Sequence, residues 1–203
     1  MGMDRQLNIS IVDDDDVARD ALRVLLEAAS FKVKDYASAT AFLDDDVFGT
    51  SCVVADMVMP GMDGLSLQRE VARRRHDLPV VIVSGFGEID LAVQAMKAGA
   101  VDFLEKPCDG EALLQCIRRA LEIGEKTRSQ AAAAKQAKRL VGSLTPREKH
   151  VLDELVGGLS NKAVAQKLGI SPRTVEVYRA QIMTKLKADS LSDLVRTALC
   201  ATG

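Results

Sequence analysis

Side chains that can do chemistry stand at the ends of four apolar, β-rich runs in the first half of the chain. They comprise three carboxylates, one hydroxyl and one amine, namely Asp13, Asp14, Asp56, Ser84 and Lys106. In a parallel sheet, ligands bind outside the carboxyl ends of the strands, so we expect these groups to meet at one mouth. Carboxylates held together repel one another unless a cation is present, and an acidic, oxygen-rich site suits Mg²⁺.

Asp56 is the candidate nucleophile of this group. Its carboxylate can attack a phosphoryl group while Mg²⁺ and the ammonium of Lys106 neutralise charge on the phosphoryl oxygens. The Ser84 hydroxyl can then bond a phosphoryl oxygen and so report whether Asp56 is modified. Taken singly, an acidic run is more often a solvated helix start, and a lysine before a proline is an ordinary surface residue. Their ordered placement at strand ends favours a phosphorylation switch.

The elements that must position these groups alternate between short β-rich runs and helical patterns, which is typical of a parallel sheet with helices on both faces. The expected strands are Asn8–Val12, Lys32–Tyr36, Cys52–Ala55, Val80–Ser84 and Val101–Glu105. The expected helices lie near 17–29, 38–45, 64–75, 89–98 and 109–123. The first helix has apolar residues at helical spacing, which predict its buried face: Val17, Ala21, Val24, Leu25 and Ala28. The first half is therefore predicted to be an α/β domain of five β/α units.

The second half contains helical patterns and no strand signal. An alanine tract at 131–134, flanked by charged and amide residues, predicts a helical linker with few apolar anchors. Four short helices are expected after it, the first beginning at Thr145-Pro146-Arg147-Glu148, where a hydroxyl cap precedes a proline and a glutamate. The remaining helix signals are Ser160, Gly169, Ser171-Pro172 and Leu191–Leu199.

Residues 160–179 are interpreted as a helix, a turn and a second helix. Apolar anchors would hold the two helices at a fixed crossing: Val164, Leu168, Ile170, Val175 and Ile182. Ser171 would cap the second helix, whose N-terminus can receive a DNA phosphate. Candidates for phosphate or groove contact are Lys162, Arg173, Thr174, Arg179 and Lys185, and candidates for base-edge contact are Glu176, Val177 and Ala180. A solvated helix surface would also explain the basic residues.

The charge is distributed unevenly between the two halves. Residues 1–124 hold 13 Lys+Arg and 22 Asp+Glu, a net charge of −9, whereas the residues after them hold 14 and 7, a net charge of +7. A basic half suits a phosphate backbone. The length of 203 residues is enough for two domains that each bury a core.

Several classes of protein are disfavoured by the composition. No apolar run approaches the ~20 residues that a membrane helix needs, and residues 1–6 contain no signal-peptide core. We therefore expect a cytoplasmic protein without membrane contact. The four cysteines lack the close pairing of metal sites, and the two histidines lie in different halves of the chain. A metal site built on cysteine or histidine is therefore not expected, and neither is catalysis by a pair of histidines.

The ordered motifs of the first half resemble a receiver domain. They are Asp13-Asp14, Asp56-Met57-Val58-Met59-Pro60-Gly61-Met62-Asp63-Gly64, Ser84-Gly85 and Phe103-Leu104-Glu105-Lys106-Pro107. The second half resembles a LuxR-type helix-turn-helix, and the whole chain is similar to two-component response regulators of the FixJ/NarL family. The resemblance implies a (βα)5 flavodoxin-like receiver at 1–123, a helical linker at 124–142 and an all-α, four-helix DNA-binding domain at 143–203.

The resemblance also implies a role for each site residue. Asp56 is the phosphoacceptor; Asp14 and Asp56 bind Mg²⁺ directly, and Asp13 acts mainly through water. The carbonyl of Val58 completes the protein ligands. Ser84 and Phe103 form a switch pair, in which the aromatic ring turns inward when the hydroxyl moves.

The implied activity is regulatory and not enzymatic. No ATP loop of the G-x-x-x-x-G-K type occurs in the chain, so a cognate sensor histidine kinase is expected to supply the phosphoryl group. The expected readout is a homodimer formed on phosphorylation, which binds double-stranded DNA at a roughly palindromic operator. RNA polymerase is a candidate further partner.

Four positions depart from the commonest receiver pattern. Ser84 stands where threonine is more frequent but keeps the hydroxyl. Val58 and Phe86 are apolar where many receivers carry polar groups that position an attacking water, which predicts slow autodephosphorylation. Cys108 follows Lys106-Pro107 where relatives usually have an aromatic residue, and we expect it to pack and not to act in redox chemistry.

Two rival functions remain. Ile11–Val17 also fits the D-x-D-x-V loop of aspartate-dependent phosphatases, in which Asp13 would be the nucleophile and Asp15 the acid-base. The α/β region is compact for that fold, and Asp56 and Lys106 would lack a role. Alternatively, the second half binds protein and not DNA.

Overall fold

The computed structural model describes residues 7–45, 47–85 and 89–202. One compact unit ends at Arg128, and a second begins at Ser129. The first contains a parallel sheet of β1 Asn8–Val12, β2 Lys32–Tyr36, β3 Cys52–Asp56, β4 Val80–Ser84 and β5 Asp102–Glu105. Its strand order is β2-β1-β3-β4-β5, so the winding reverses between β1 and β3. This is the doubly wound order whose ligands bind at the carboxyl edge beside that reversal.

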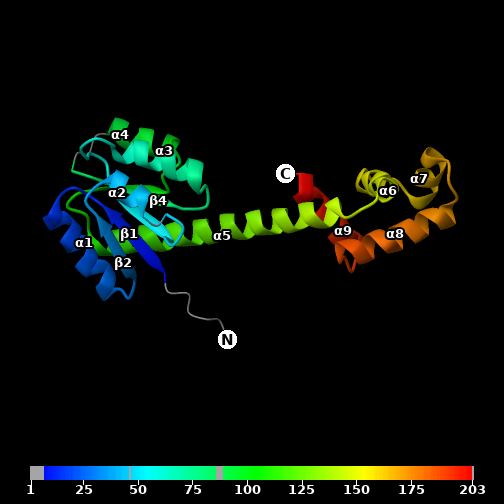
Figure 1. Ribbon diagram of the computed structural model, residues 1–203, viewed down its shortest axis with the longest axis horizontal. Coiled ribbons are helices and arrows are strands. Elements are labelled where there is room, and N and C mark those ends of the chain that lie inside the picture. The colour runs from blue at the N-terminus through cyan, green and yellow to red at the C-terminus, as the bar shows by residue number, and fades with distance from the viewer. Residues whose placement is uncertain (1–6, 46, 86–88, 203) are drawn as a thin grey trace. The chain divides into compact units, whose positions relative to one another are not determined.

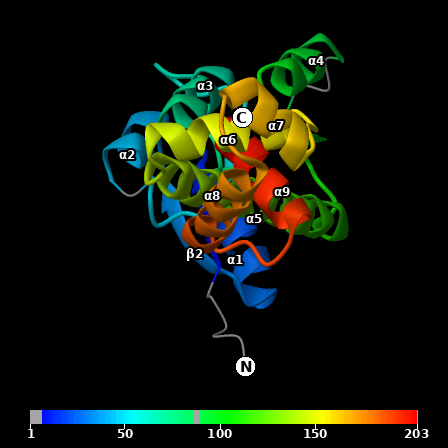
Figure 2. The same cartoon turned by 90° about the vertical axis from the view of Figure 1, so that its right-hand side faces the viewer.

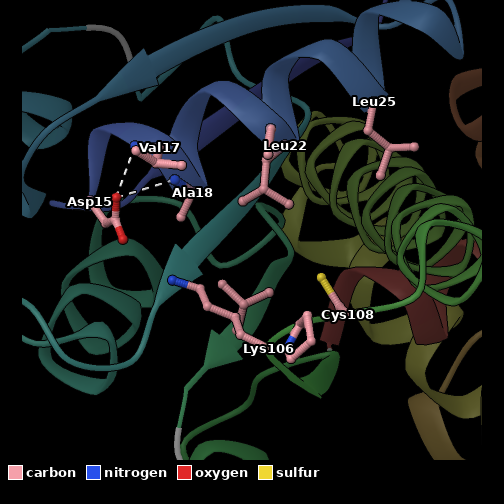
Figure 3. A pocket seen from close by; sticks show the side chains of 10 residues that line it. Asp15, Val17, Ala18, Leu22, Leu25, Lys106 and Cys108 are labelled. Atoms are coloured by element: carbon pink, nitrogen blue, oxygen red, sulfur yellow. Dashed lines mark hydrogen bonds between the residues drawn. The ribbon is translucent and has the colours of Figure 1, made fainter.

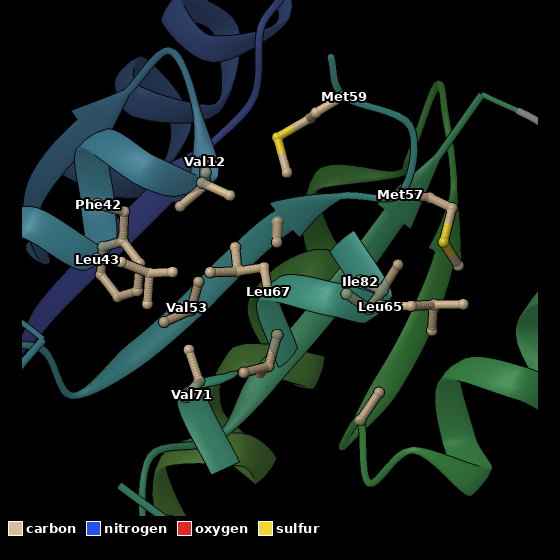
Figure 4. Close-up of a cluster of buried hydrophobic side chains, with 14 of the residues drawn as sticks. Val12, Phe42, Leu43, Val53, Met57, Met59, Leu65, Leu67, Val71 and Ile82 are labelled. Carbon is tan, nitrogen blue, oxygen red and sulfur yellow. The ribbon is translucent and has the colours of Figure 1, made fainter. Parts of the chain in front are cut away.

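Helices cover both faces of this sheet (Figure 1). They are α1 Asp16–Ala28, α2 Ala39–Asp44, α3 Gly64–Arg74, α4 Ile89–Lys97 and α5 Gly110–Gly142. Because successive strand residues point to opposite faces, each strand contributes to two cores. Val53 joins the cluster with Phe42 and Leu67 from α2 and α3 (Figure 4), whereas Val54 joins Leu26 and Ile117 from α1 and α5.

The predicted buried face of α1 is wrong except at Leu25, which is partly buried against the core. Val17 is 79% exposed and Val24 61% exposed, and the buried residues of the helix are Leu22 and Leu26. The helix carries apolar residues on more than one side, and spacing alone does not say which side meets the sheet. The larger leucines pack into the core, which leaves an apolar stripe in contact with solvent.

Other predicted elements differ from the structure mainly at their ends. β3 includes Asp56, and β5 begins one residue later than expected, at Asp102. The helix expected to end near residue 123 continues to Gly142 as part of α5, so the linker is helical, as predicted. The alanine tract favours this continuation because alanine has the highest helix propensity.

The second unit contains α6 Pro146–Val156, α7 Asn161–Leu168, α8 Pro172–Leu186 and α9 Leu191–Thr202. Figure 2 shows these helices as a group. Their side chains form one core, in which Val164, Val175 and Ile182 are fully buried. The predicted start of α6 is confirmed as a capping box, since Glu148 N–H donates to Thr145 Oγ1 and Thr145 N–H donates to Glu148 Oε2. Within the described ranges, no helix combines the length and the apolar composition needed to span a bilayer.

Candidate functional site

The carboxyl ends of β3, β4 and β5 lie side by side because the strands are paired in register. Asp56 is opposite Val83, and Ser84 is opposite Glu105. The pairing continues into the loops, since Lys106 N–H donates to Ser84 O at 2.7 Å. The predicted convergence of strand-end residues therefore occurs.

Lys106 joins two of the carboxylates, although it lies 93 residues from Asp13 along the chain. Its Nζ is 2.6 Å from Asp13 Oδ2 and 2.6 Å from Asp56 Oδ1. The Asp13 side chain is 1% exposed and that of Asp56 9% exposed, so the ion pairs are poorly screened by water. Burial lowers the pKa of Lys106, but its hydrogen bonds to Asp13 and Asp56 outweigh that effect and raise the pKa. Lys106 is therefore cationic at neutral pH.

The two carboxylate oxygens of Asp56 have different partners. Oδ1 faces Lys106, whereas Oδ2 accepts a hydrogen bond of 2.9 Å from Val58 N–H. Burial raises the pKa of Asp56, and Lys106 acts in the opposite direction. The carboxylate thus has a fixed orientation in a partly desolvated setting.

The acidic residues fit a divalent cation. Asp13, Asp14 and Asp56 each offer an oxygen, and the three oxygens lie within 4.8 Å of one another. Three carboxylates beside the single ammonium of Lys106 leave an excess of negative charge. Asp14 is exposed, which suits Mg²⁺ because this ion retains several waters when it binds protein carboxylates.

The rest of the acidic run has other roles. Asp15 caps α1, its Oδ1 accepting from Val17 N–H at 2.8 Å and from Ala18 N–H at 3.3 Å. Asp16 pairs with Arg19. The phosphatase interpretation requires Asp15 as an acid-base, and here its oxygen is engaged by the helix N-terminus.

The two predicted switch residues lie in different surroundings. Ser84 is fully buried at the end of β4. Phe103 is half-buried on β5 and borders a pocket of about 550 Å³ with Ile89, Val93 and Met96 of α4. Phe86, on which the prediction of slow autodephosphorylation also rests, lies outside the described residues.

Cys108 borders a second apolar recess, beside the acidic site. This pocket of about 480 Å³ lies between α1 and the loop after β5, and Leu22, Leu25 and Lys106 also line it (Figure 3).

The helix-turn-helix forms from α7 and α8. Gly169 ends α7 with φ of +66°, a conformation that glycine adopts without steric cost. Ser171 caps α8, as predicted, with Oγ accepting from Thr174 N–H at 3.0 Å. Glu176, Val177 and Ala180 are exposed on α8, so their side chains are accessible to a partner.

Ion pairs divide the basic residues of the second unit into two groups. Lys185 Nζ is 2.7 Å from Glu148 Oε2, and Lys167 Nζ is 2.8 Å from Glu154 Oε2. Among the described residues, no ion pair involves Lys162, Arg173 or Arg179. Lys185, in contrast, has an internal partner.

Two residues important for the site were missed by the sequence analysis. Arg19 Nη1 donates to Asp13 O at 2.8 Å. Gly64 lies against the backbone of Asp56, where an added Cβ would be 2.4 Å from Asp56 O. Gly64 belongs to the motif that follows Asp56, but neither its spacing nor that of Arg19 reveals these contacts.

The two units together define a class of protein. The first has the sheet order and acidic mouth of a receiver, and the second has the helix-turn-helix of a DNA-binding domain; their combination is that of a two-component response regulator. Residues 9–118 match the response regulator receiver domain, and residues 142–198 match the luxR family of bacterial regulatory proteins.

Similar proteins narrow this class to one family. The transcriptional regulatory protein FixJ of Azorhizobium caulinodans is 47% identical over 201 residues, 98% of this chain and 95% of FixJ. The response regulator StyR has a TM-score of 0.79 at 38% identity, covering 96% of this chain and 98% of StyR. Full-length FixJ from B. japonicum has a TM-score of 0.58 at 45% identity, covering 97% and 98%. The chain belongs to the FixJ/NarL family of response regulators.

Membership confirms the main functional prediction. The protein is a transcriptional regulator of a two-component system, and its activity depends on phosphorylation. A histidine kinase and DNA are the partners that this architecture implies. The phosphatase and protein-binding interpretations are set aside by the receiver and luxR matches, and the relatives are transcription regulators.

Proposed function

We propose that Asp56 accepts a phosphoryl group from the phosphohistidine of a cognate sensor kinase. The observation that supports this most strongly is the position of Lys106, whose ammonium contacts Asp13 and Asp56 together. Asp56 Oδ1 attacks phosphorus, the P–N bond breaks, and the kinase histidine leaves with its electron pair and takes up a proton. Lys106 compensates negative charge at Asp56 throughout.

Asp14 and Asp56 would hold Mg²⁺ directly, with the Val58 carbonyl as a third protein ligand and Asp13 acting mainly through water. The 4.8 Å grouping of the three acids supports this assignment. When bound, the ion supplies positive charge that neutralises the phosphoryl oxygens. The protein itself orients Asp56 through Val58 N–H and Lys106.

Ser84 and Phe103 are proposed to convey the modification, with the Ser84 hydroxyl bonding a phosphoryl oxygen and the Phe103 ring turning inward. The receiver is proposed to span 1–123, the helical linker 124–142 and the DNA-binding domain 143–203. Phosphorylation would promote a homodimer that binds an operator in the cytoplasm, with RNA polymerase as a further partner. The protein would carry out no enzymatic turnover of its own.

Acetyl phosphate in the presence of Mg²⁺ tests this proposal. One phosphoryl group should appear on residue 56 by peptide mass spectrometry, and EDTA should prevent its appearance. Molar mass by light scattering and affinity for operator DNA should rise together with the label. A protein that remains unlabelled at residue 56 at saturating Mg²⁺ would contradict the proposed function.

DNA recognition is proposed to use α7 and α8. Phosphate or groove contacts are assigned to Lys162, Ser171, Arg173, Thr174, Arg179 and Lys185, and base-edge contacts to Glu176, Val177 and Ala180. The lack of ion pairs at Lys162, Arg173 and Arg179 among the described residues supports the first assignment. Lys185 would have to exchange its contact with Glu148 for one with DNA.

Arg173→Ala should weaken DNA binding and make it less sensitive to salt. Arg173 is exposed in the first turn of α8, and the loss of one phosphate contact should reduce the slope of log affinity against log salt by about 1. Fluorescence anisotropy over a salt series measures both quantities. Lys167→Ala is the matched control, because its charge is already paired with Glu154. Equal slopes for the Arg173 variant and the native protein would exclude the assigned contact.

A further inference from the structure

Asp13 is fixed from several directions in the structure. Its N–H donates to Tyr36 O at 3.1 Å, and its carboxylate accepts from Asp15 N–H at 3.0 Å and from Lys106 Nζ at 2.6 Å. Its carbonyl oxygen accepts from Arg19 Nη1 at 2.8 Å. This last contact involves a residue outside the strand-end motifs.

The guanidinium of Arg19 is itself held by two acids. Its Nε donates to Asp35 Oδ2 at 3.2 Å, and its Nη2 donates to Asp16 Oδ1. Asp35 lies in β2, and Asp16 opens α1. The Arg19 side chain is only 13% exposed, so three acceptors from three segments engage one planar group with little room to move.

The contact of Arg19 with Asp13 O holds the peptide group that joins Asp13 to Asp14. The carbonyl of Asp13 and the N–H of Asp14 belong to the same peptide group, which is planar. Holding the oxygen of that group fixes the plane from which the Asp14 backbone continues, and with it the direction of the Asp14 side chain. Asp14 is one of the three acids whose oxygens lie within 4.8 Å.

Charge and geometry predict opposite effects for Arg19. A positive charge near a cation site repels the cation, so removal of the charge alone should strengthen Mg²⁺ binding. Removal of the fork that holds the peptide should instead weaken it, because residues that orient metal ligands typically contribute about 10-fold to 100-fold in affinity. Lysine preserves the charge but lacks the planar set of five donors.

We propose that Arg19 is a positioning residue for the Mg²⁺ and phosphoryl site, acting through the Asp13–Asp14 peptide. The inference rests on the proposed function, since it concerns the same acidic cluster. Arg19→Gln should weaken Mg²⁺ binding by about 10-fold in calorimetric titration, and Arg19→Lys should recover only part of the loss. In acetyl phosphate labelling, the Mg²⁺ concentration for half-maximal rate should rise, while the rate at saturating Mg²⁺ should approach the native rate.

Arg23→Gln is the matched control. Arg23 lies one turn further along α1 and pairs with Asp20 and Glu27, so its loss removes a guanidinium from the same helix without touching the Asp13 peptide. Its Mg²⁺ titration should match that of the native protein. Asp35→Asn, which weakens one support of Arg19, should shift the titration in the same direction as Arg19→Gln by a smaller factor, and thermal unfolding without Mg²⁺ checks that each variant is folded.

The outcomes separate this inference from the proposed function. A native protein that binds Mg²⁺ and is labelled, beside an Arg19→Gln variant with unchanged or tighter Mg²⁺ binding, overturns the positioning role alone. A lysine variant equal to the native protein also overturns it, because charge would then suffice. A native protein that neither binds Mg²⁺ nor accepts the label overturns both.

Discussion

The Asp56→Asn variant should take up no phosphoryl group from acetyl phosphate under conditions that label the native protein. An amide oxygen lacks the negative charge of the attacking carboxylate. The substitution also removes one of two acceptors, because Asp56 uses Oδ1 for Lys106 and Oδ2 for Val58 N–H. Intact-mass spectrometry measures the loss, and the variant should bind operator DNA equally with and without the phosphodonor.

Asp13→Asn provides the informative comparison for this result. Asp13 contacts Lys106 and belongs to the acidic cluster, so its variant should be labelled more slowly and should recover as Mg²⁺ is raised. A phosphatase with its nucleophile at residue 13 predicts the reverse pattern. Label that persists in Asp56→Asn and disappears in Asp13→Asn would contradict the assignment of Asp56 as the phosphoacceptor.

Gly64→Ala should impair the site by moving the backbone beneath Asp56. A Cβ at position 64 would lie 2.4 Å from Asp56 O and 3.1 Å from Met57 Cα. Both atoms belong to the backbone, so neither can rotate away as a side chain would. The free energy of unfolding should fall by about 1–3 kcal/mol, which is typical of overpacking. Urea unfolding measures this change.

Phosphorylation should be affected more strongly than stability in this variant. Gly64 begins α3, and its N–H donates to Met57 O at 3.0 Å, so relief of the contact displaces the segment that carries Asp56, the proposed nucleophile. A displacement of about 1 Å can cost roughly 100-fold in rate. The initial rate of labelling by acetyl phosphate, compared at equal folded fraction, tests this effect.

Gly85→Ala is the steric control for Gly64→Ala. Gly85 follows β4 at the same edge of the sheet, and an added Cβ there meets no heavy atom of the described residues within 4 Å. Its free energy of unfolding should therefore remain close to the native value. Equal stability and an equal labelling rate for the Gly64 variant and the native protein would contradict the prediction. They would show that the backbone of β3 and α3 accommodates the added methyl group without effect on Asp56.

The sequence by itself determined the type of fold and the members of the acidic site. Alternating strand and helix patterns predicted the five β/α units, because a strand and a helix bury side chains with different periods. The strand ends identified Asp13, Asp56 and Lys106, since parallel strands present their carboxyl ends at one edge. The helix starts at Thr145 and Ser171 were predictable because capping depends on residues only three positions apart in the sequence.

Only the tertiary structure decided which faces and contacts are used. Spacing assigned Val17 and Val24 to the buried face of α1 although they are exposed, because the helix has apolar residues on more than one side and the sheet packs against Leu22 and Leu26. The contact of Arg19 with the Asp13 carbonyl and the approach of Gly64 to Asp56 depend on where separate segments meet in space. Local spacing carries no record of such meetings, since strand order and helix packing set them across the whole receiver.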